Sequence, residues 1–100
     1  MGKYYILDGH TVVVCDNVLQ WAMWFKKANR HIDKTIKGEV EVSTVFLGLD
    51  HSFGDGAPLL FETMIFGGEH DQYQERYATW EEAEAGHKKA CAIAFIEVLN

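Results

Sequence analysis

The chain has 100 residues and a net charge of −6, and 48% of its residues are hydrophobic. This length suits one small domain over residues 1–100, and the apolar fraction is too high for a disordered chain. The acidic balance argues against nucleic acid or anionic membranes as partners, because phosphate contacts need an excess of lysine and arginine. No apolar run approaches the roughly 20 residues of a membrane span. Two cysteines without a signal-peptide pattern indicate reduced thiols in a cytoplasmic protein.

The first elements expected are a hairpin and a helix. Strands are predicted at Tyr4–Leu7 and Thr11–Val14, on either side of an Asp-Gly pair that favours tight turns. A helix is predicted over about residues 16–29 with Asp16 as its N-cap, because apolar residues recur there at spacings of three and four. Its stripe consists of Val18, Trp21, Ala22, Phe25 and Ala28, whereas Leu19, Met23 and Trp24 lie outside it. This second apolar flank predicts a further contact surface.

The central strands are the most apolar part of the chain. His31–Ile36 and Glu39–Leu49 are predicted to form a second hairpin, followed by a strand at Leu59–Phe66. From Thr44 onward these strands carry apolar residues on both faces, and such strands need cover on both sides. Two helices can cover only one face of a sheet of this size. The other face is therefore expected to meet a second copy of the chain, in a homodimer or a higher oligomer.

The C-terminal part is predicted to be a short strand followed by a helix. A glycine-rich turn leads into a strand at Tyr73–Ala78, and Thr79 with Glu82 three residues later forms a capping box for the helix. The order of elements predicts an α+β domain. We expect an antiparallel sheet of about four to five strands with two amphipathic helices on one face.

The loop after the long central strand is the first candidate site. Its Asp50 and His51 place a carboxylate beside an imidazole, which can transfer protons, and its glycines allow a ligand close to the backbone. The alternative is a connecting loop in which Asp and Gly only provide turn geometry. Loops as long as this one, which separates the strands predicted at Glu39–Leu49 and Leu59–Phe66, are often functional. We expect alanine at both positions to change stability by less than about 0.5 kcal/mol while reducing activity.

A charged residue in the next strand is the second candidate. Glu62 interrupts an apolar run, and a carboxylate there must be paired or must change its pKa. If the following strand folds back, Arg76 or Tyr77 can reach it. The pair is either structural or a clamp for a polar ligand. An enzyme is a further alternative, with Asp50, His51 and Glu62 in one cleft.

The histidines do not indicate a metal site. The chain has five of them, but none lies at a recognised ligand spacing. We therefore expect no metal and no cofactor, and no catalytic residue follows from the sequence.

Several blocks of sequence together carry a family resemblance. They are YYILDGH, WAMWF, VSTVFLGLDHSFG, PLLFETMIFGG and ERYATWEEAEAGH. With these blocks the chain resembles, over nearly its whole length, a group of small uncharacterised proteins encoded by tailed bacteriophages and prophages. The resemblance implies a phage accessory protein made in the host bacterial cytoplasm. By analogy, such proteins often inhibit host defence.

The expected function follows from the phage resemblance together with the apolar residues on both faces of the sheet. It is a non-catalytic counter-defence factor that sequesters a small nucleotide immune signal between subunits. Trp24 or Tyr77 would stack on bases and Arg30 or Arg76 would contact phosphate. The alternatives are a direct protein inhibitor of a host defence complex and the small enzyme described above.

Overall fold

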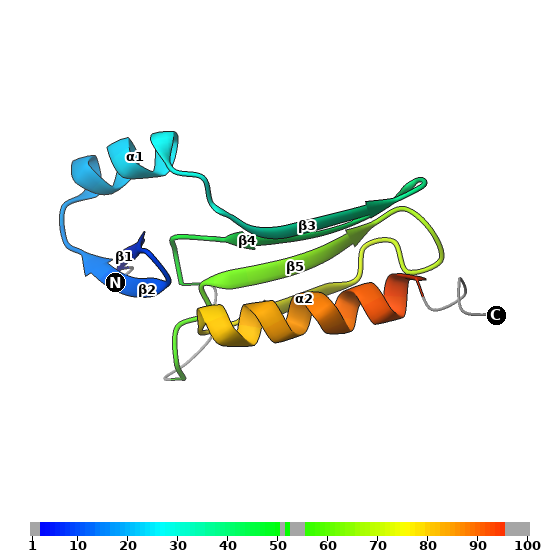
Figure 1. The fold of residues 1–100 in the computed structure, drawn as a ribbon. Coiled ribbons are helices and arrows are strands. Elements are labelled where there is room, and N and C mark those ends of the chain that lie inside the picture. Colours follow the sequence, from blue (N-terminus) through cyan, green and yellow to red (C-terminus); the bar gives the residue numbers. More distant parts are fainter. Residues whose placement is uncertain (1–2, 51, 53–55, 96–100) are drawn as a thin grey trace.

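The computed structural model describes residues 3–50, 52 and 56–95 (Figure 1). Its elements in chain order are β1 (Tyr4–Asp8), β2 (Thr11–Cys15), α1 (Val18–Lys27), β3 (His31–Lys37), β4 (Val40–Phe46), β5 (Phe61–Phe66), β6 (Gln74–Tyr77) and α2 (Trp80–Phe95). β1 and β2 form a hairpin, and β3-β4-β5-β6 form a four-stranded antiparallel sheet in that order. The predicted α+β class is confirmed. Within the described residues, no helix is long and apolar enough to cross a membrane.

Helix α1 packs on the hairpin, not beside α2 on the four-stranded sheet where the sequence placed it. The indole Nε1 of Trp21 donates a hydrogen bond of 3.0 Å to the carbonyl of Tyr5, and its ring lies 5.0 Å from that of Tyr4. The side chain of Asn17, one residue after the expected cap, accepts hydrogen bonds from two amides of the first turn. Figure 1 shows α1 and the hairpin together at one end of an elongated molecule.

Helix α2 covers one face of the four-stranded sheet. Strands β4 and β5 pair so that their inward residues lie opposite one another, and all of them are fully buried: Val42 and Ile65, Thr44 and Thr63, Phe46 and Phe61. The helix contributes mainly small buried residues, which are Ala83, Gly86, Ala90 and Ala94. Such side chains allow a helix to lie close to a sheet, so the strands provide most of the apolar volume of this layer.

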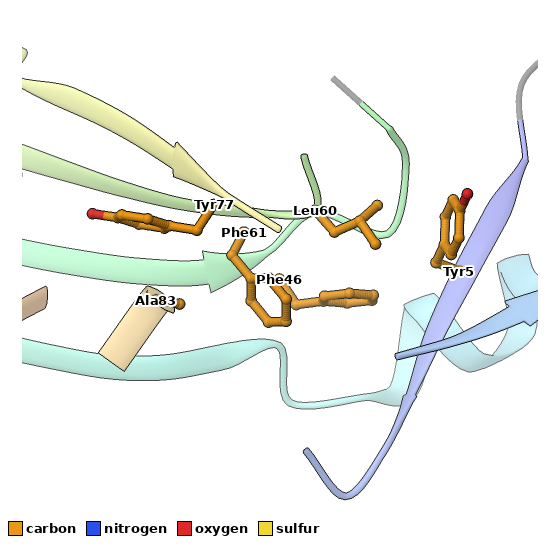
Figure 2. Packing of buried hydrophobic residues seen from close by; sticks show 6 residues of the cluster. All are labelled: Tyr5, Phe46, Leu60, Phe61, Tyr77 and Ala83. Atoms are coloured by element: carbon orange, nitrogen blue, oxygen red, sulfur yellow. The ribbon is translucent and has the colours of Figure 1, made fainter. Parts of the chain in front are cut away.

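A cluster of aromatic and aliphatic side chains joins the hairpin to the sheet. It consists of Tyr5, Phe46, Leu60, Phe61, Tyr77 and Ala83. Figure 2 shows Phe46, Leu60 and Phe61 between Tyr5 on one side and Tyr77 on the other. The amide of Tyr5 also donates a hydrogen bond of 2.9 Å to the carbonyl of Gly48. Each large side chain buried in this way contributes roughly 1.5–3 kcal/mol, so the cluster fixes the hairpin on the end of the sheet.

Candidate functional site

The face of the sheet opposite α2 is not covered by either helix in the described part of the chain. The strand pairing and the alternation of side chains place eleven residues there: His31, Lys34 and Ile36 of β3; Glu41, Ser43 and Val45 of β4; Glu62, Met64 and Phe66 of β5; Gln74 and Arg76 of β6. We call this set the open face. Ile36 is 59% exposed and Phe66 is 41% exposed. The open face therefore exposes apolar side chains to solvent among a larger number of polar ones.

Glu62 and Arg76 form an ion pair on the open face. The two residues lie opposite each other in neighbouring strands, and Arg76 Nε donates to Glu62 Oε2 at 2.9 Å. Gln74 donates a second hydrogen bond to the same oxygen. The Glu62 side chain is only 13% exposed. Its charge is thus satisfied within the sheet, which fits the structural alternative for this pair.

The remaining charges of the open face are also balanced. Lys34 Nζ lies 3.9 Å from Glu41 Oε2 on the neighbouring strand, in a pair more exposed than Glu62–Arg76. With His31 counted as neutral, the open face therefore carries two acidic and two basic side chains and no net charge. This balance contrasts with the charge of −6 on the whole chain.

Tyr77 does not reach Glu62, because it lies on the other face of the sheet. It is 8% exposed, and its ring packs directly against Gly86 of α2, where a Cβ atom would overlap the Cζ and Oη atoms of the ring. Burial is the main cause that raises the pKa of the Tyr77 hydroxyl. Tyr77 is thus part of the core and is not available to stack on a ligand.

Trp24 and Arg30 are also used inside the fold. The Trp24 ring meets the Phe46 ring edge-on at 5.8 Å. Arg30 Nη1 donates to the carbonyl of Phe46 at 3.0 Å, and its guanidinium lies 3.8 Å from the centre of the Phe25 ring. A nucleotide would have to compete with these contacts for both side chains. The predicted set of Trp24, Tyr77, Arg30 and Arg76 is therefore not assembled into one pocket.

The Asp50 side chain accepts hydrogen bonds from backbone amides that follow it in the chain. Its Oδ1 accepts hydrogen bonds from the amides of Ser52, at 2.8 Å, and Leu59, at 2.9 Å. These contacts support the turn-forming alternative for this carboxylate. His51 lies outside the described residues, so a site formed by Asp50, His51 and Glu62 stays a prediction.

A buried polar network around His87 was not expected from the sequence. His87 is 2% exposed; its Nδ1 lies 2.7 Å from Thr44 Oγ1, and its Nε2 lies 2.9 Å from Thr35 Oγ1. Thr44 Oγ1 lies 2.6 Å from Thr63 Oγ1, and Asp33 approaches His87 Nε2 to 3.7 Å. Burial lowers the pKa of His87, and the nearby Asp33 carboxylate opposes this shift.

The network is suited to holding α2 in place, not to chemistry on a substrate. A carboxylate, an imidazole and a hydroxyl in series resemble a nucleophilic triad, but Thr44 and Thr63 are both fully buried. The sequence held one signal for this network, which was the presence of polar residues at inward positions of β4 and β5. These residues face a histidine on the apolar stripe of a helix.

A cleft lies between the turn of the hairpin and the start of α2. It has a volume of about 310 Å³ and is lined by His10, Thr11, Val12, Ala78, Thr79, Trp80 and Glu81. The His10 ring stacks on the Trp80 ring with centres 3.8 Å apart and planes 9° from parallel. Nothing in the sequence brings these two residues together, because they belong to elements far apart along the chain.

Comparison of the chain with family models, curated proteins and solved structures gives no match. The resemblance to phage proteins therefore stays a prediction. In the described segments 3–50, 52 and 56–95, no three His, Cys, Asp or Glu residues are grouped so that they could hold a metal ion.

Proposed function

We propose that this protein is a non-catalytic phage accessory protein that acts in the host bacterial cytoplasm by binding and inhibiting a host defence protein. The observation that carries this proposal is the outer flank of α1. Leu19 is 73% exposed and Met23 is 64% exposed, and both lie on the side of the helix opposite Trp21 and Phe25, which pack inward. Two large apolar residues one helical turn apart form the kind of anchor pair that protein grooves bind.

The charges of α1 indicate the chemistry of the partner. The helix contains no acidic residue, and Lys26 and Lys27 occupy its last turn on the same side as Met23. This basic end belongs to a chain with a net charge of −6. A matching partner would present an apolar groove with acidic residues at one end.

The proposal is tested by measuring phage infection on bacterial hosts that carry different defence systems. Expression of the wild-type chain should increase plaque formation on at least one such host, and the double variant Leu19→Gln, Met23→Gln should lose this effect. Val14→Thr, at a position 48% exposed on the hairpin, is the matched control and should retain it. If the double variant protects phage as well as the wild-type chain, the α1 flank is not the binding surface.

Sequestration of a small nucleotide is the second candidate, and the His10–Trp80 cleft favours it. Its volume of about 310 Å³ is at the lower end of the range for small-molecule sites, and a planar base can stack on such rings. Glu81 would repel phosphate within the cleft, so the phosphates would have to point outward. Incubation with cyclic nucleotides and ADP-ribose-type signals, followed by heat release and mass analysis, tests this candidate. Recovery of an intact signal from the wild-type chain, but not from His10→Ala, would support nucleotide sequestration over inhibition of a protein.

A further inference from the structure

The open face carries surface that a single copy of this chain leaves in water. Ile36 and Phe66 are 59% and 41% exposed and lie on either side of Glu41 in one row of the face. Met64 is next to Phe66 on this face of β5, Val45 lies one row further on, and both are half-buried. Exposed apolar residues that share one sheet face mark an interaction surface more often than isolated ones do.

The charges on this face favour a second copy of the chain as its partner. Two copies that each carry a charge of −6 repel each other over most of their surfaces. On the open face this repulsion is absent, because Lys34 pairs with Glu41 and Arg76 with Glu62. Covering the face also leaves no carboxylate unpaired, since Glu62 already accepts two hydrogen bonds within the sheet.

The size of the face is that of a small interface. Four strands spaced about 4.8 Å apart, with about six residues each at about 3.3 Å per residue, span roughly 400 Å² in projection. Two such faces bury at least twice this area, because side chains stand out from the sheet. Interfaces at the small end of the range bury less than about 1,200 Å² in total, so the association should be reversible at micromolar concentration.

The edges of the sheet are poorly suited to the same role. β3 has an irregular register between His31 and Asp33, and its exposed positions include Lys34 and Lys37. Bulges and lysines on an edge strand oppose the addition of another strand. At the other edge, β6 has only four residues. Association through the face is therefore favoured over association through an edge.

We infer that two copies of this chain form a symmetric dimer by packing open face against open face. In such an interface the same patch meets itself. The pair Ser43 and Met64 lies in the middle row of the face, between the rows of Glu41 with Phe66 and Val45 with Glu62. Apolar residues of both copies then cover each other. This inference is independent of the α1 flank, which stays exposed in the dimer.

The test is the mass of the full chain over a concentration series. Light scattering and sedimentation from about 1 to 200 μM should show a rise from 11.4 kDa to twice this mass. Ile36→Lys and Phe66→Lys each place an unpaired charge on the face and should weaken dimerisation at least tenfold. Met23→Lys, at a position 64% exposed on α1, adds the same charge elsewhere and should leave the dimer unchanged.

Circular dichroism and thermal melting show whether each variant is folded. If a lysine variant fails to fold, Ile36→Thr and Phe66→Thr keep strand-forming residues and should weaken the dimer in the same direction. A monomer at every concentration overturns the inference. An oligomer that survives the folded open-face variants, or that is lost in Met23→Lys alone, also overturns it. Loss of phage protection in the Leu19, Met23 variant with an intact dimer would separate the two proposals.

Discussion

Replacing Gly86 by alanine tests how closely α2 packs on the sheet. Gly86 lies inside the helix, where glycine is less favourable than alanine by about 0.8–1.0 kcal/mol. On helix propensity alone, Gly86→Ala should therefore stabilise the protein. The structure predicts the opposite, because the new Cβ atom would overlap Cζ and Oη of Tyr77.

The cost of this overlap exceeds the gain in propensity. Tyr77 is 8% exposed and lies in the cluster that joins the hairpin to the sheet, so its ring has little room to move (Figure 2). Inserting atoms into such a packed site costs about 1–3 kcal/mol and occasionally more. We expect Gly86→Ala to lower the free energy of unfolding by about 1–2 kcal/mol. For a domain of this size, this corresponds to a fall in melting temperature on the order of 10 °C.

Two substitutions of Tyr77 provide the controls. Tyr77→Phe keeps the Cζ atom, so Gly86→Ala should still be destabilising in that background. Tyr77→Leu removes the far end of the ring, and there Gly86→Ala should become stabilising by up to about 1 kcal/mol. Urea unfolding at one fixed protein concentration measures all of these values, since association also shifts apparent stability. If Gly86→Ala stabilises the otherwise wild-type chain, the proposed contact between Tyr77 and α2 is refuted.

Three further predictions concern the polar side chains. Burial lowers the pKa of His87 below 6.5, so the folded chain binds fewer protons than the unfolded chain. The free energy of unfolding should therefore fall as the pH drops below about 6.5. In urea titrations His87→Gln should reduce this dependence on pH, and an unchanged dependence would exclude the network as its cause. Asp50→Ala should cost about 1 kcal/mol, which exceeds the limit of about 0.5 kcal/mol expected from the sequence, because two backbone amides lose their acceptor. Asp50→Asn should retain most of the stability, and equal losses in thermal melts would contradict this role. Arg76→Met should cost about 1 kcal/mol of stability, because Glu62 keeps only its bond from Gln74. Adding Glu62→Gln should restore part of the lost stability. If the stability changes of the two substitutions simply add, the ion pair does not contribute.

The local turns and caps were predictable because their stereochemistry is local. The first hairpin turns at Gly9 and His10, one residue later than the expected Asp-Gly pair, because Asp8 ends β1 opposite Thr11. Gly9 has the positive φ of 62° that its position in such a turn requires. The capping box is also confirmed. Thr79 Oγ1 accepts from the amide of Glu82 at 3.1 Å, and Glu82 Oε1 accepts from the amide of Thr79 at 3.2 Å. Neither feature depends on the rest of the fold.

The position of α1 was not predictable in the same way. Its apolar stripe predicted one inward side, and Trp21 and Phe25 of that stripe are half-buried, but a stripe does not specify which sheet a helix packs against. The stripe was also misassigned in part, because Val18 is 47% exposed and Trp24, expected outside it, is half-buried against Phe46. The expected cap at Asp16 was also one residue early, because both Asp16 and Asn17 are good caps and Asn17 makes the hydrogen bonds.

The candidate site was predicted in part. A carboxylate in an apolar strand needs a partner, and Arg76 on the returning strand provides it. Tyr77 failed as an alternative because neighbouring residues in a strand point to opposite faces. The contact between His87 and Thr35 joins residues 52 positions apart. No local pattern specifies such a pair, so the network could be found only in three dimensions.

The central strands carry apolar residues on both faces, and the two faces differ in what covers them. Small residues such as Ala83 and Ala90 bring α2 close to one face, and this single helix is enough to bury Val42, Phe61 and Ile65 there. Because α1 packs on the hairpin, the described chain provides no second layer for Ile36 and Phe66. A sheet with balanced charges on that face is well suited to pairing with its own copy, and the dimer would then present two α1 flanks to other proteins.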